Sequence, residues 1–122
     1  MIKVLQLLIR IAGLGALVLG ASFLFGSGVA PLSVHMTFGG IVALLLAILA
    51  VRALIDRVRI PAAIAALAWA AATVYVGTLQ DWWVGAGSHV AIEVVHPLLG
   101  IGAIGLAEML AAAINRKRAS LT

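Results

Sequence analysis

Long apolar runs separated by short polar turns account for most of the chain. The runs cover about residues 2–26, 34–55, 61–80 and 89–115. Each has close to the roughly 20 residues that a helix needs to cross a bilayer. None alternates between apolar and polar residues as a membrane β-strand does. Because lipid offers no hydrogen-bond partners to the backbone, only helices or a closed barrel can span it, so these runs are expected to be helices. We therefore expect an all-α membrane protein: a single domain, residues 1–122, with four transmembrane helices in an up-down bundle.

Composition supports lipid as the medium around this chain. Of the 122 residues, 65% are hydrophobic and 10% are charged. Such a chain has too few polar side chains to cover a surface that faces water. The lipid bilayer is therefore its first expected partner. Because the sequence contains no cysteine, disulfide and thiol chemistry are excluded.

Basic residues gather at one end of the predicted bundle. They are Lys3, Arg10, Arg52, Arg57, Arg59, Arg116, Lys117 and Arg118. The two outer loops, residues 26–33 and 81–88, contain no Lys or Arg. The positive-inside rule then predicts that both termini are cytoplasmic. The net charge of +4 is thus a topology signal, and we expect no nucleic acid as a partner.

Two histidines lie inside the second and fourth apolar runs, and each is followed by glycine four positions later. The pairs are His35 with Gly39 and His96 with Gly100. Ionisable residues inside membrane helices are costly and mark functional sites by default. His35 precedes Arg52 by 17 positions and His96 precedes Arg116 by 20, which places them at similar depths, roughly 26 and 30 Å from the basic end.

The spacing of the two histidines favours a metal between them. Helices two and four stand diagonally in an up-down bundle, with axes roughly 13 Å apart when neighbours pack at about 8–10 Å. Two imidazoles across that gap are too far apart for a direct hydrogen bond but suit an iron between them. Gly39 and Gly100 lie on the histidine faces one turn away, where they leave room for a flat ring. Gly40 and Gly102 are expected to widen that slot.

These motifs resemble those of membrane b-type cytochromes. Residues 34–40 and 93–102, each with a histidine near the outer end of its helix, look like one four-helix half of haem A synthase. They are more loosely similar to cytochrome b561-type bundles. The resemblance implies haem b held by His35 and His96 as iron ligands, in a multi-pass protein of the bacterial inner (plasma) membrane. Because the inner half lacks histidine, a second haem is not expected.

The resemblance implies electron transfer or redox sensing rather than enzymatic turnover. With both axial positions of the iron filled, substrate chemistry would need a ligand to leave. Expected partners are a second copy of the chain or a larger redox complex, with a quinone as one redox partner class. One feature opposes the haem reading: no Lys or Arg is available at the outer face for the haem propionates.

Glu93 and His89 share a helix face with His96 and leave other readings open. Glu93 could orient an imidazole or relay protons. Alternatively, His89, Glu93 and His96 could hold a non-haem metal or ion in a small enzyme or transporter. A third reading makes the histidines structural, in a subunit of a larger membrane complex. Pro97 removes an amide that the Glu93 carbonyl would bind, which loosens the helix there.

A second charged pair is predicted nearer the basic end. Arg10 lies seven positions beyond Lys3, and Glu108 lies eight positions before Arg116, so both reach a similar depth. The first and fourth helices are neighbours in an up-down bundle. We expect a buried Arg10–Glu108 ion pair that ties these helices together.

Overall fold

The computed structural model describes residues 1–87 and 90–122, with the backbone alone at residues 83, 84 and 91. Its elements are α1 (Ile2–Leu24), α2 (Leu32–Ile55), α3 (Ile60–Thr78), α4 (Gln80–Gly85), a π-helical turn (Ala91–Val95) and α5 (His96–Ser120). In the described part of the chain, four helices are long and apolar enough to cross a membrane, the last running from Ile92 to Ser120. The prediction of an all-helical chain with four helices long and apolar enough to cross a membrane is confirmed for the described residues.

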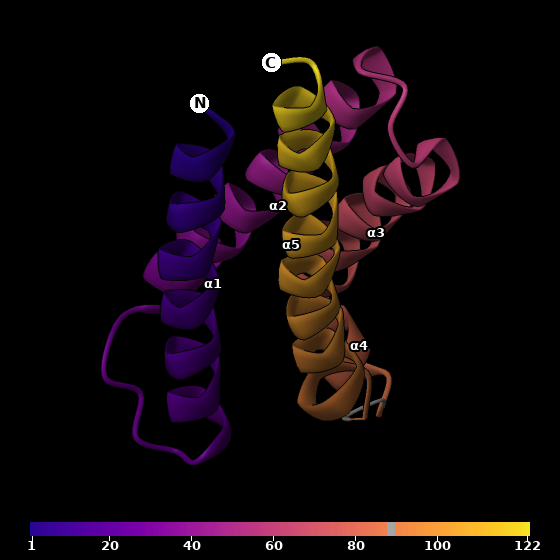
Figure 1. The fold of residues 1–122 in the computed structure, drawn as a ribbon. Helices are drawn as coiled ribbons and strands as arrows, with labels where there is room; N and C mark the ends of the chain where they lie inside the picture. Colours follow the sequence, from indigo (N-terminus) through magenta and orange to yellow (C-terminus); the bar gives the residue numbers. More distant parts are fainter. Residues whose placement is uncertain (88–89) are drawn as a thin grey trace.

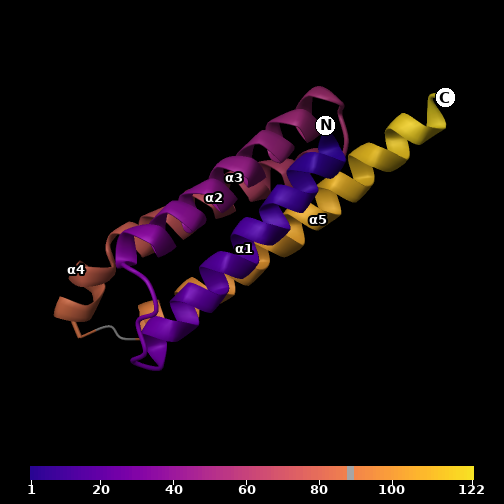
Figure 2. The same ribbon diagram turned by 90° about the vertical axis from the view of Figure 1, so that its left-hand side faces the viewer.

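The four long helices run up and down in a bundle (Figures 1 and 2). α1 and α3 each pack against both α2 and α5, and α2 also meets α5 across the centre. Both termini and the α2–α3 turn lie at one end, which we call the terminal end, and α4 lies at the other, the distal end (Figure 2). The basic segments predicted to share one end do share it.

The hydrophobic core fills the terminal half of the bundle. Its fully buried large side chains are Ile2, Ile9, Leu46, Leu49, Leu110 and Ile114. α3 adds the buried alanines Ala63, Ala66 and Ala70, whose small size lets neighbouring helices approach closely. In contrast, Thr73 is the only buried residue among the described ones in ranges 14–41 and 71–102. The distal half is therefore loosely filled by protein.

Glycines of α1 allow close approach of two other helices. A Cβ added at Gly13 would lie 2.6 Å from Cδ1 of Ile104 on α5, and one at Gly15 would lie 2.9 Å from Cε1 of Phe38 on α2. Such contacts are too short for any larger residue without movement of the partner. Small residues thus bring α1 against its neighbours by van der Waals packing, as expected for helices in lipid.

The predicted Arg10–Glu108 ion pair is present but lies at the surface of the bundle. Arg10 donates from Nη2 to Oε2 of Glu108 at 2.9 Å and also from Nε to Oε1, and Gln6 donates to the same carboxylate. The Arg10 side chain is 54% exposed, so the expectation of a buried pair is wrong. One turn away, Gly13 and Ile104 pack so closely that no space for the pair remains between α1 and α5.

Two further details differ from the sequence expectations. The outer loop predicted at residues 81–88 begins with the short helix α4, which ends at Gly85. α5 continues to Ser120, five residues past the predicted end, because its basic last turn is soluble and complements the partial negative charge of a helix C-terminus. Lys117 there donates to the Asp56 carbonyl, while Arg52 pairs with the Asp56 carboxylate at 3.0 Å.

Candidate functional site

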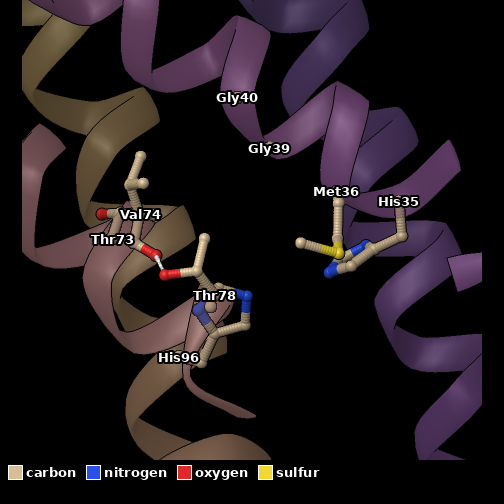
Figure 3. Close-up of a pocket in the computed structure, with 9 residues that line it drawn as sticks. His35, Met36, Gly39, Gly40, Thr73, Val74, Thr78 and His96 are labelled. Carbon is tan, nitrogen blue, oxygen red and sulfur yellow. Dashed lines mark hydrogen bonds between the residues drawn. The ribbon is translucent and has the colours of Figure 1, made fainter. Parts of the chain in front are cut away.

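His35 and His96 face each other in the distal half of the bundle. His35 belongs to the second turn of α2 and His96 is the first residue of α5. Their ring centroids are 6.0 Å apart, and the ring planes are nearly perpendicular, at 77°. Figure 3 shows the two rings approaching from opposite helices. The prediction that they meet at one depth is confirmed.

The His35 ring is fixed by α1. Its Nδ1 lies 2.9 Å from the carbonyl oxygen of Ala16. A carbonyl only accepts, so Nδ1 carries the proton and donates, which leaves Nε2 with a free lone pair. The Phe23 ring lies edge-on at 6.0 Å between centroids, and a Cβ at Gly20 would come within 3.1 Å of Cε1. Three residues of one helix therefore position this imidazole.

The His96 ring rests on α3 without a hydrogen bond at Nδ1. This nitrogen is buried, and no described residue is its hydrogen-bond partner. A Cβ at Gly77 would lie 2.8 Å from Cε1 of His96, so only glycine leaves space for the ring. Buried polar atoms without partners are uncommon in proteins and often belong to functional sites.

Two cavities flank the histidine pair. The larger has a volume of about 540 Å³ and opens among α1, α2 and α5, while the smaller has about 140 Å³ and lies between α2 and α3. The residues common to both are His35, Gly39, Thr73 and His96. A Cβ at Gly39 would meet nothing within 4 Å. The larger volume falls within the roughly 300–1,000 Å³ typical of cofactor and ligand sites.

Most of the remaining predicted site residues lie around these cavities. Gly40 lines the smaller one, and Gly100 and Glu93 line the larger one. Gly102 lines neither: a Cβ there would lie 2.4 Å from Cζ2 of Trp69, so this glycine accommodates an indole instead of widening the slot. Trp69 in turn donates from Nε1 to the Leu99 carbonyl at 2.8 Å, which ties α3 to α5.

The alternative metal site is only partly within the described residues. His89 lies outside them, and Glu93 is exposed at the rim of the larger cavity. Across residues 1–87 and 90–122, no group of three or more His, Cys, Asp or Glu side chains is placed to hold a metal ion. The described residues therefore offer two facing imidazoles and no third ligand of these types.

The backbone is irregular immediately before His96. Residues 91–95 form a π-helical turn, and Pro97 follows the histidine. Proline has no backbone amide to donate, so a loosened helix is expected at the level of Glu93. The π-helical turn, which includes Glu93, agrees with that expectation. Single π-helical turns within α-helices are rare overall, and those that occur are often at functional sites.

Sequence reasoning missed the two glycines that seat the rings. A signal was available for Gly77 alone: shifting the chain by 61 positions aligns His35 with His96 and Ala16 with Gly77, whereas Gly20 aligns with Asp81. Ala16 and Gly77 each precede their histidine by 19 positions and each contacts it. The relation suggests two similar helical hairpins, each carrying one histidine toward the centre.

Fold and site together define a bundle of four helices long and apolar enough to cross a membrane, with a facing histidine pair between two cavities. Comparison adds no relative: no protein-family model, no curated protein and no solved structure matches this chain.

Proposed function

We propose that this chain binds one haem b between His35 and His96 and serves as a membrane electron carrier or redox sensor. The observation that carries the proposal is the 6.0 Å separation of the ring centroids. With metal–nitrogen bonds of roughly 2.0–2.1 Å, two opposed ligand nitrogens stand about 4 Å apart, and their ring centres about 6 Å apart. The spacing therefore suits one iron held from both sides.

The surroundings of the pair support a flat, apolar cofactor. Gly39 leaves open space beside His35, and cavities extend on both sides of the two rings. The lone pair of His35 Nε2 is available because Nδ1 donates to Ala16. Such a second bond on a ligating histidine fixes its tautomer and raises its basicity.

Haem b would supply reversible one-electron oxidation and reduction of iron. The protein would hold the haem iron through the neutral imidazoles of His35 and His96 and would surround the group with apolar helices. Filled axial positions favour electron transfer over substrate chemistry. By the positive-inside rule, we propose that the terminal end lies on the cytoplasmic side of a bacterial plasma membrane and that the haem lies near the outer face.

Retention of the cofactor should depend on ligation by at least one of the two histidines together with apolar contact. The described residues lining the cavities include no Lys or Arg that could pair with a propionate. Iron ligation and apolar contact must then provide most of the affinity. Suitable redox partners are a quinone, a second copy of the chain or another subunit of a redox complex in the same membrane.

The visible spectrum of the purified protein tests this function. We expect a red protein with about one haem per chain and sharp low-spin bands after reduction. His35→Ala and His96→Ala should each abolish the low-spin bands, whereas Glu93→Gln should keep them, because Glu93 is exposed and no iron ligand in this account. A haem-free protein, or histidine variants that keep the low-spin bands, would contradict the proposal.

A further inference from the structure

The two histidines occupy equivalent positions in their hairpins but are held very differently. His35 is bonded at Nδ1 and contacts three residues of α1, whereas Nδ1 of His96 has no partner among the described residues. We propose that His96 is the displaceable ligand, and that a small neutral diatomic molecule binds the iron in its place while His35 stays bound. This inference rests on the proposed haem function.

Ligand strength is the first reason. The Nδ1–H of His35 donates to the Ala16 carbonyl, and that bond increases electron donation from Nε2 to a metal. His96 lacks this support from the described residues, although Gly77 stands where Ala16 stands in the first hairpin. His96 would therefore be the weaker iron ligand of the two.

Freedom to move is the second reason. Displacing His35 would break its bond to Ala16 and its contact with Phe23. Nδ1 of His96 has no such bond to a described residue, and the His96 backbone lies between a π-helical turn and Pro97, where the regular ladder of α-helical hydrogen bonds is interrupted.

The surroundings of His96 give the third reason. Thr73 lines both cavities together with His96. Its hydroxyl donates to the Trp69 carbonyl at 2.9 Å and can still accept a bond from a displaced Nδ1–H.

The exchange balances without electron or proton transfer. With carbon monoxide as the probe, the bond between iron and His96 nitrogen breaks and a bond between iron and carbon forms. The imidazole leaves as a neutral group. The iron would stay ferrous throughout, and His35 would remain bound to it.

Resonance Raman spectroscopy of the reduced protein with carbon monoxide tests which histidine remains. Photolysis of the complex leaves a five-coordinate iron whose iron–histidine stretching frequency rises when Nδ1 is hydrogen-bonded. In His96→Gly, His35 is the remaining one of the two proposed ligands, and its Nδ1 is hydrogen-bonded. We therefore expect the wild-type frequency to be high and to match that of His96→Gly. A match to His35→Gly, or no binding of carbon monoxide by the wild type, would overturn the inference.

A second comparison uses the glycines that seat the rings. Gly77→Ala presses on His96, with 2.8 Å from the new Cβ to Cε1, and should speed carbon monoxide binding about tenfold, equivalent to about 1.4 kcal/mol of activation free energy. Gly20→Ala makes the corresponding, slightly milder contact beside His35, at 3.1 Å, and should change the rate much less. Equal effects, or a larger effect of Gly20→Ala, would contradict the asymmetry.

The two proposals fail in different ways. A chain that holds no haem contradicts the proposed function, and this inference with it. A low-spin haem protein whose photolysed complex retains His96 keeps the proposed function and overturns only the assignment of His96 as the displaceable ligand.

Discussion

The terminal and distal halves of the bundle are built from the same four helices but packed in opposite ways. In the terminal half, leucine, isoleucine and alanine side chains fill the centre, with Leu46 and Leu110 fully buried. In the distal half the centre holds two histidines, open space at Gly39 and two cavities. Within one fold, one half is packed for stability and the other leaves room at its centre.

This contrast explains how a loosely filled region can still place two imidazoles 6.0 Å apart. Binding sites must be held within fractions of an ångström by rigid surroundings. Here the packed terminal half fixes the positions of α2 and α5, and close contacts at Gly20 and Gly77 orient the rings beyond it. The cavities can then remain open without loss of the histidine geometry.

Filling the open half should have the largest effect. Gly39→Leu would place a branched side chain in the space that borders both cavities, so we expect nearly complete loss of bound haem. Gly105→Leu is the matched control, because Gly105 is also helical with nothing within 4 Å of its Cβ position but is exposed on the outside of α5. The ratio of haem to protein after purification measures both variants.

Because both substitutions replace a helical glycine by leucine, their effects on helix propensity are similar. A Gly39→Leu protein with the wild-type haem ratio would show that the open space is not the cofactor site. Equal losses in both variants would point to general damage instead.

Opening the packed half should lower stability and leave the site chemistry unchanged. Leu46→Ala removes a fully buried side chain, and truncations of this kind typically cost about 2–5 kcal/mol. Reversible unfolding in mixed detergent micelles measures the loss. The folded fraction should keep the wild-type haem spectrum, and a changed spectrum in that fraction would contradict the independence of the two halves.

The Arg10–Glu108 pair at the surface of the terminal half should contribute least. Polar interactions between membrane helices average about 0.6 kcal/mol and reach about 1.7 kcal/mol. We expect Arg10→Ala and Glu108→Ala each to lower unfolding free energy by this order, and the exchange of the two charges to recover part of it. No recovery in the exchanged variant would mean that the contact is not an energetic pair.

The sequence predicts the helices well because length and hydrophobicity alone decide a membrane span. The shared depth of His35 and His96 also follows from counting residues to the basic end. The contacts that orient the rings do not follow, because Gly20 and Gly77 act on histidines of other helices, and nearly uniform apolar helices give little sign of which face turns inward. For the same reason Gly102, assigned to the slot, lies against Trp69 instead.

Electron paramagnetic resonance of the oxidised protein tests most directly whether both histidines bind one iron. The ring planes of His35 and His96 lie at 77°, and two axial imidazoles at nearly perpendicular angles give a highly anisotropic low-spin ferric signal. We therefore expect this signal, and after ¹⁵N labelling we expect hyperfine coupling to nitrogens of two histidines. A purely high-spin signal, coupling to a single histidine, or the absence of any haem signal would contradict it.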